Sequence, residues 1–190
     1  MKSIKYLLSG IYPPISLIPI LCLLFSKVDR CIIEKDVARW KKEVHLDSDI
    51  GFYHALSHLL LWYKEFRNLF YRRMGKTGKI LSRVLPGEKT LYLPPSQIGG
   101  GLFIRHGYST FVNTHRIGDN LTIHQNTTIG DDGKGGYPTI GNNVFIGTGA
   151  IIIGDITIGD NAKIGAGAIV VDSIPANSII FSLKARKNEK

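Results

Sequence analysis

Residues 140–175 read IGNNVFIGTGAIIIGDITIGDNAKIGAGAIVVDSIP, and this stretch repeats every six residues. Each hexad begins with an aliphatic residue, and a small or apolar residue follows four positions later. An α-helix repeats about every 3.6 residues and a β-strand about every 2, so a period of six fits neither alone. It is typical of a solenoid in which each hexad is one short strand followed by a corner.

The repeat extends upstream to Ile98, with a register break of one residue before Ile117 and of five before Ile140. Three hexads make one triangular coil, and stacked coils bury a continuous column of aliphatic side chains. We therefore predict a mainly β fold, a left-handed parallel β-helix over residues 89–190, preceded by a small α-helical region over residues 1–88. The five-residue break predicts a loop at residues 131–139, and the chain ends in a basic tail.

Two segments of the N-terminal region carry apolar residues on one helical face. They predict helices at residues 28–45 and 51–75, the second capped by Asp47 or Ser48 and ended by Gly75.

Residues 6–25 contain no charge and are just long enough to span a bilayer, but their prolines predict a broken helix. A buried helical hairpin and peripheral membrane contact remain as alternatives for this stretch.

The composition narrows the class of protein. Two cysteines argue against a disulfide framework and favour the cytoplasm, with the inner membrane face as an alternative location. The net charge of +9 fits phosphate-bearing ligands or an anionic surface. No recognition motif accompanies the charge, so we expect no nucleic-acid partner. His54 and His58 share a helical face without a third ligand nearby, so we expect no metal site.

Stacking places residues one coil apart side by side. Allowing for the register breaks, one outer row contains His106, Gln125, Thr148 and Ala166. The adjacent row contains Arg105, His124, Gly147 and Gly165. A loop that interrupts a rigid solenoid is a second natural place for function. These rows and the loop are therefore the predicted functional surface.

Three motifs carry a family resemblance: GLFIRHG at residues 101–107, the glycine-rich loop ending in Tyr137-Pro138, and AKIGAGA at residues 162–168. Residues 90–186 resemble the catalytic half of serine acetyltransferases and of the related acetyltransferases of capsule and surface-polysaccharide pathways. The resemblance implies direct transfer of acetyl from acetyl-CoA to a hydroxyl, without a metal or a covalent enzyme intermediate. It also implies a homotrimer, with CoA in the groove between neighbouring prisms.

The resemblance further implies roles for particular residues. His106 is the expected general base, and Gln125 or a backbone N–H is the expected oxyanion donor. The expected CoA contacts are Gly147, Thr148, Lys163, Gly165 and Ala166, with Lys184 and Arg186 at the phosphates. The expected acceptor contacts are Arg105, His124, Lys134 and Tyr137.

The chain departs from serine acetyltransferases at the acceptor side. Arg105 replaces the aspartate that precedes the catalytic histidine, Leu91 stands where a second aspartate orients it, and Tyr137 replaces an Arg-His pair in a shorter loop. Partners for the two charges of free serine are thus missing, and buried charges need partners. The sequence therefore favours a sugar hydroxyl of a surface polysaccharide as acceptor.

Two alternatives to that function stay open. One is a serine O-acetyltransferase of cysteine biosynthesis. The other is a non-catalytic or metal-binding β-helix module, because His106, His115 and His124 are possible metal ligands.

Overall fold

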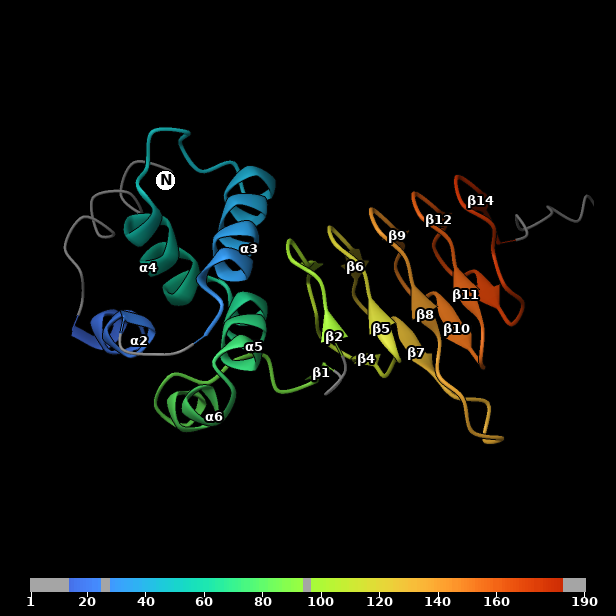
Figure 1. Ribbon diagram of the computed structural model, residues 1–190, viewed down its shortest axis with the longest axis horizontal. Helices are drawn as coiled ribbons and strands as arrows, with labels where there is room; N and C mark the ends of the chain where they lie inside the picture. Colours follow the sequence, from blue (N-terminus) through green and yellow to red (C-terminus); the bar gives the residue numbers. More distant parts are fainter. Residues whose placement is uncertain (1–13, 25–27, 94–96, 183–190) are drawn as a thin grey trace, which may run out of the picture.

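The structure is a computed structural model that describes residues 14–24, 28–93 and 97–182. It consists of a helical region followed by a stack of short strands (Figure 1). The first part of the uncharged stretch, and both Lys184 and Arg186, lie outside the described residues.

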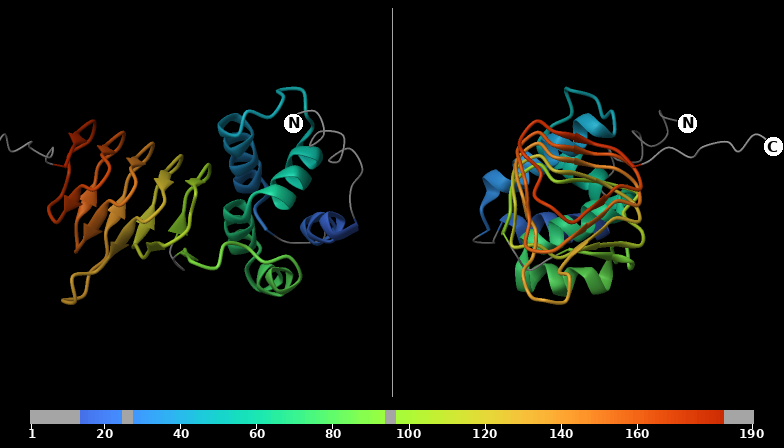
Figure 2. Two further views of the ribbon diagram at one scale, coloured as in Figure 1. Left: turned by 180° about the vertical axis from the view of Figure 1, so that it is seen from behind. Right: turned by 90° about the vertical axis from the view of Figure 1, so that its right-hand side faces the viewer.

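The described strands form three parallel sheets, one along each side of a prism. The first sheet contains β1 (Leu91–Tyr92), β4 (Thr110–Val112), β7 (Thr128–Gly130), β10 (Ile151–Ile153) and β13 (Ile169–Val170). The second contains β2 (Gln97–Ile98), β5 (Arg116–Ile117), β8 (Thr139–Ile140) and β11 (Thr157–Ile158). The third contains β3 (Phe103–Arg105), β6 (Thr122–His124), β9 (Phe145–Ile146), β12 (Lys163–Ile164) and β14 (Ile179–Ile180). Seen end-on, the coils lie one behind another (Figure 2), which confirms the predicted β-solenoid.

The aliphatic residue of each hexad points into the prism. Ile117 pairs with Ile140, and Ile123 pairs with Ile146, so like residues stack directly. The predicted column is buried throughout, at Ile104, Ile117, Ile123, Ile129, Ile140, Ile146, Ile152, Ile158 and Ile164. Burying an isoleucine side chain contributes roughly 1.5–3 kcal/mol, so this column is the main source of the solenoid's stability.

The coils differ in length. Residues that are hydrogen-bonded one coil apart are separated by 19 positions at Gly100 and Asp119, by 23 at Asn120 and Asn143, and by 18 at Asn142 and Asp160. The last separation is 16, because Ile174 bridges Ile158 two residues early. The six-residue repeat predicted for residues 140–175 is therefore wrong in its final hexad.

One corner of the prism is built from stacked asparagines. Asn120, Asn143, Asn161 and Asn177 all have φ between 55° and 63°, a left-handed conformation that asparagine adopts more readily than most residues. Each side-chain amide donates to the next, over 3.1, 3.2 and 3.0 Å. Because an amide both donates and accepts, the four residues satisfy one another along the stack.

The described helices are α2 (Pro14–Leu24), α3 (Arg30–Glu43), α4 (Phe52–Trp62), α5 (Lys64–Arg73) and α6 (Gly75–Val84). The prediction at residues 28–45 is confirmed as α3. The prediction of one helix over 51–75 is wrong, because the backbone turns extended at Tyr63, with φ −121° and ψ 104°. Gly51, rather than Asp47 or Ser48, precedes α4, and Gly75 begins α6 instead of ending a helix.

Helix α2 contradicts the prediction that prolines break the uncharged stretch. Pro14 stands at the first position of the helix, where a backbone N–H would have no partner within the helix. The helix then continues through Pro19. Ile20 and Leu23 are buried in the helical core. Among the residues that the structure describes, no helix is long and apolar enough to cross a membrane.

A buried ion pair joins the helices to the first coil. Arg73 Nε of α5 lies 2.9 Å from Asp36 Oδ2 of α3, and both side chains are almost fully buried. The guanidinium also donates to the carbonyls of Ile98 and Gly99, and Asp36 Oδ1 accepts from Gly101 N at 2.7 Å. This pair therefore ties two helices to the open end of the prism.

An aromatic cluster covers the rest of that end. Trp40 Nε1 donates to the carbonyl of Leu102 at 2.8 Å. Its ring meets Phe66 and Phe103 edge-on, with centroids 5.3 and 4.8 Å away. Edge-to-face pairs add about 0.5–1.5 kcal/mol beyond the area they bury, so Trp40 holds α3 and α5 against β3.

We expect Arg73→Met to lower the free energy of unfolding by about 3–5 kcal/mol, because it leaves the Asp36 carboxylate buried without its partner. Chemical denaturation followed by circular dichroism measures the loss. Arg73→Met combined with Asp36→Leu is expected to recover part of it, since no buried charge remains. Glu34→Gln is the control: it breaks an exposed pair with Arg30 and is expected to lower stability by less than about 1 kcal/mol. Equal losses in the two single variants would contradict the role given to the buried pair.

Candidate active site

His106 lies on an enlarged corner of the first coil. Arg105 pairs with His124 and Phe111 pairs with Thr128, so the chain advances six residues from 105 to 111 where the next coil advances four, from 124 to 128. The corner therefore contains two additional residues. The φ of His106 is 54° and that of Ser109 is 52°. Non-glycine residues in this left-handed region are uncommon and gather at functional sites.

Helix α5 holds this corner from the side. Glu65 Oε1 accepts a hydrogen bond from Gly107 N at 3.2 Å. A Cβ on Gly107 would lie 3.0 Å from Glu65 Cγ and 3.1 Å from Leu91 Cδ2, so only glycine fits there without displacing its neighbours. Leu91 thus packs beside the corner as an apolar contact, and the nearby carboxylate comes from α5.

The His106 side chain is exposed. Within residues 14–24, 28–93 and 97–182, its imidazole has no hydrogen bond or ion pair, and its ring contact is with Tyr108, centroids 6.2 Å apart. The imidazole is therefore accessible to a ligand from solvent.

A cleft of about 260 Å³ lies between the helices and the His106 corner. Two carboxylates, Glu43 and Glu65, and two basic side chains, Arg105 and His106, line it. Its remaining walls are Trp40, Val44, Tyr63, Phe103 and Ile104. Glu43 also pairs with Arg39 at 3.1 Å, which holds the carboxylate in place. The cleft thus offers both signs of charge over an apolar floor.

Sequence reasoning missed Glu43 and Glu65. Both belong to helices more than forty residues before His106, and no period or motif links them to the coils. The one available signal was the presence of acidic residues in the predicted helices.

His124 lies beside Arg105 in the adjacent coil, and its ring meets Phe145 edge-on at 5.1 Å. Partial burial lowers the pKa of His124, and electrostatic interaction with Arg105 lowers it further. These effects favour the uncharged form of the His124 ring.

The structure brings the two predicted rows together. Register pairs Arg105 with His124, Gly149 N donates to the carbonyl of Gln125, and Gly167 N donates to that of Thr148. His106, Gln125, Thr148 and Ala166 therefore lie along one edge, between the first and third sheets. Gln125 Oε1 is buried there without a hydrogen-bond partner in the described part of the chain. A buried unpaired amide oxygen is a feature that a bound group can satisfy.

The residues predicted to contact CoA follow that edge. Lys163 is exposed on the outer side of β12, and Gly165 and Ala166 follow it. A Cβ on Gly147 would lie 2.7 Å from Ala166 N, so coil stacking alone requires glycine at this position. Lys184 and Arg186, predicted at the phosphates, lie outside the described residues.

The loop at residues 131–139 leaves the prism at a different corner. It joins β7 of the first sheet to β8 of the second, whereas His106 lies between the third sheet and the first. Tyr137 meets His115 edge-on, with ring centroids 5.7 Å apart, and Lys134 is exposed near Asp132. Within one chain, Lys134 and Tyr137 are therefore not brought to His106.

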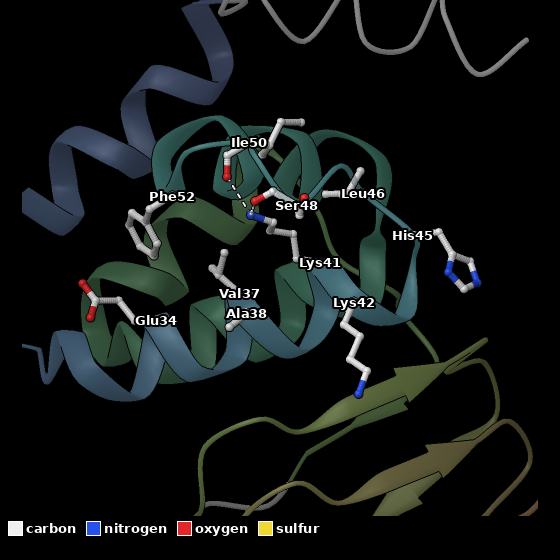
Figure 3. A pocket seen from close by; sticks show the side chains of 10 residues that line it. All are labelled: Glu34, Val37, Ala38, Lys41, Lys42, His45, Leu46, Ser48, Ile50 and Phe52. Atoms are coloured by element: carbon white, nitrogen blue, oxygen red, sulfur yellow. Dashed lines mark hydrogen bonds between the residues drawn. The ribbon is translucent and has the colours of Figure 1, made fainter.

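A larger cavity, of about 680 Å³, lies in the helical region between α3 and the segment that leads to α4. Figure 3 shows the Lys41 ammonium donating to the carbonyl of Ile50, at 2.7 Å; it also donates to that of Ser48, at 2.8 Å. No residue predicted for the site lines this cavity. The described residues also contain no group of three or more His, Cys, Asp or Glu side chains placed to hold a metal ion.

Comparison with known proteins identifies the class. The bacterial transferase hexapeptide family (six repeats) matches residues 137–172. The serine acetyltransferase of Helicobacter pylori strain J99 is 35% identical over 164 residues, which are 84% of this chain and 92% of that protein. The "Putative colanic acid biosynthesis acetyltransferase WcaB" of Escherichia coli K12 is 44% identical over 92 residues, 47% of this chain and 57% of that protein.

A solved structure shares the fold. The serine acetyltransferase of Neisseria gonorrhoeae, in complex with serine, superposes with a TM-score of 0.59 at 28% identity, over 83% of this chain and 68% of that one. The fold and the matches together define an acyltransferase of the hexapeptide-repeat class. Within that class, the chain belongs to the serine acetyltransferase family. The matches over most of the chain favour the serine alternative above the polysaccharide acceptor that the sequence alone favoured.

We expect Arg105→Gln to raise the pKa of His124 toward its ordinary value, because a neighbouring positive charge is removed. The histidine ring signals in an NMR titration report this midpoint. Arg116→Gln is the control, since Arg116 is an exposed cation on another face of the prism. An unchanged His124 midpoint in Arg105→Gln would show that the two side chains are not electrostatically coupled.

Proposed function

We propose that this protein is an acetyl-CoA-dependent serine O-acetyltransferase with His106 as its general base. The observation that carries the proposal is the cleft, which combines His106 with two carboxylates and Arg105. The relatives that match over most of the chain and bear the name serine acetyltransferase support it independently.

The cleft supplies charges that suit a small amino acid. Glu43 and Glu65 are partners for an ammonium group, and Arg105 is a partner for a carboxylate. In this proposal Glu43 and Glu65 take the place of the aspartates that the chain lacks at positions 91 and 105. A desolvated zwitterion requires a partner for each charge, so a cleft with both signs favours serine over a neutral hydroxyl.

The reaction needs a base and an oxyanion donor. The neutral imidazole of His106 takes the proton of the acceptor hydroxyl as that oxygen attacks the thioester carbon of acetyl-CoA. A tetrahedral oxyanion forms, and the Gln125 amide or a backbone N–H stabilises it. When the carbon–sulfur bond breaks, the imidazolium returns the proton to the thiolate, which leaves O-acetylated acceptor, free CoA and neutral His106.

We infer that CoA lies along the same edge, between two copies of the prism. Apolar side chains on the two sheets that flank the edge are exposed, as at Phe111, Phe145, Ile151, Ile169 and Ile179. Exposed apolar faces of this kind favour self-association, and a homotrimer would cover them. The proposed CoA contacts are Gly147, Thr148, Lys163, Gly165 and Ala166, with Lys184 and Arg186 at the phosphates. A neighbouring chain would bring Lys134 and Tyr137 toward the acceptor, and the donor places the reaction in the cytoplasm.

A sugar hydroxyl is the second candidate acceptor. The match to the colanic acid acetyltransferase supports it, because identity there reaches 44% over 92 residues. Leu91 beside the His106 corner also fits an acceptor that does not depend on a paired aspartate.

We expect His106→Ala to lower serine-dependent CoA release at least about a hundredfold, the usual contribution of a positioned general base. Thiol detection of free CoA, with acetyl-CoA and serine as substrates, measures it. His54→Ala is the control, because that histidine is exposed on α4 and does not line the cleft. Activity that survives in His106→Ala would sink the proposed mechanism. Acetyl-CoA binding with no response to serine would instead direct the search to glycan acceptors.

We expect Glu43→Gln and Glu65→Gln each to raise the KM for serine while changing the KM for acetyl-CoA little, because each variant removes a charge partner of the ammonium group. Steady-state kinetics with each substrate varied in turn separates the two constants. Glu34→Gln on the exposed side of α3 is the control. If both cleft variants keep the KM for serine, the ammonium does not bind there.

A further inference from the structure

Helix α6 presents a two-part outer surface, which we call the α6 face: Lys76, Lys79, Ile80, Arg83 and Val84, all exposed. The opposite side contains Gly78 and Leu81, which are buried. At about 100° per residue, Lys79, Arg83 and Lys76 lie together, and Ile80 and Val84 form a stripe directly beside them. A surface helix more commonly turns its aliphatic residues inward, so this pair is available to an apolar partner.

The positive charge on this face has no acidic partner among the described residues. Residues 64–84 contain seven basic residues and one acidic residue, Glu65. In the described part of the chain, the side chains of Lys76, Lys79 and Arg83 make no ion pair or hydrogen bond. The face thus combines uncompensated positive charge with exposed aliphatic side chains.

The face is held rigidly. A Cβ on Gly78 would lie 2.0 Å from the carbonyl oxygen of Tyr71, so α6 packs directly on the backbone of α5. The Tyr71 hydroxyl then donates to the carbonyl of Leu85 at 2.6 Å, just after α6 ends. These contacts fix which side of α6 faces outward.

A second exposed apolar surface lies at the same part of the molecule. Ile18, Leu21 and Leu24 of α2 are each about half exposed, at 46%, 51% and 50%. Helix α2 packs on α4, and Figure 1 places it, like α6, on the helical region away from the strands. Apolar contact area is therefore available beyond α6 itself.

The cations and aliphatic side chains of the α6 face indicate which kind of partner would bind it. A second copy of the chain would oppose three cations to three cations, which is repulsive. A soluble polyanion would pair with the cations and leave Ile80 and Val84 in water. An anionic lipid surface satisfies both parts, because headgroup phosphates pair with the cations while aliphatic side chains enter the interface.

We propose that the α6 face docks this protein on an anionic membrane surface. Lys76, Lys79 and Arg83 meet lipid phosphates, and Ile80 and Val84 lie at the boundary between headgroups and acyl chains. The association is peripheral, and it does not depend on which hydroxyl the enzyme acetylates.

Vesicle co-sedimentation of the full chain tests the proposal, with vesicles of phosphatidylcholine alone and of phosphatidylcholine mixed with phosphatidylglycerol. We expect binding to the mixed vesicles that weakens as salt is added. Lys79→Glu with Arg83→Glu is expected to reduce partitioning roughly twentyfold or more, since each basic side chain near such a surface strengthens binding about fivefold. Ile80→Ser with Val84→Ser is expected to reduce it at unchanged charge.

The matched control is Lys42→Glu with Arg116→Glu, which changes the net charge equally at exposed cations elsewhere. Circular dichroism and CoA release confirm that each variant is folded. No binding of the unaltered protein to mixed vesicles, or an equal loss in the control, would overturn the proposal. It would also be overturned by a dimer that Ile80→Ser with Val84→Ser disrupts while vesicles have no effect.

Discussion

The buried pair of Asp36 and Arg73 is the interaction on which the arrangement of the molecule depends. The first coil of a solenoid exposes an edge of unpaired carbonyls, and Arg73 supplies donors for those of Ile98 and Gly99. Burial raises the pKa of Asp36, and the adjacent guanidinium of Arg73 opposes that shift. The guanidinium therefore stabilises the charged form of the buried carboxyl group. Because the pair seats α5 on the coil, it also sets where Glu65 meets the corner that carries His106.

Much of the fold follows from one residue in six. An isoleucine that recurs at that period can be buried only if the chain turns a corner between successive strands, so the prism was predictable. The break at Tyr63 was not, because α4 and α5 are both amphipathic and no proline or glycine separates them. The two residues added at the His106 corner were also hidden. The step from Val112 to Ile117 is one residue shorter than a hexad and offsets one of the two, so the sequence shows a shift of only one residue.

The candidate site was predictable to the same extent. The period placed His106, Gln125, Thr148 and Ala166 in one row, and the register of β3 with β6 agrees. Glu43 and Glu65 could not be found this way, since only the packing of helices on the first coil brings them to the cleft. The missing aspartates at Leu91 and Arg105 favoured a sugar acceptor, whereas the carboxylates that the helices bring to the cleft support the proposal of serine. A site that helices and coils form together cannot be predicted from the six-residue repeat alone.

The corner stack of asparagines has a consequence for how such a chain can change length. Adding one hexad would rotate every later strand by a third of a turn, which would carry Thr148 and Ala166 to another side of the prism. Insertions are therefore neutral only as whole coils, or as excursions that leave and rejoin the same corner. The chain contains one such excursion, because the spacing along the asparagine stack is 23 residues around the loop, and its last coil is shortened to a spacing of 16. Residues that share one edge of the prism therefore stay aligned only when an insertion returns the chain to the corner that it left.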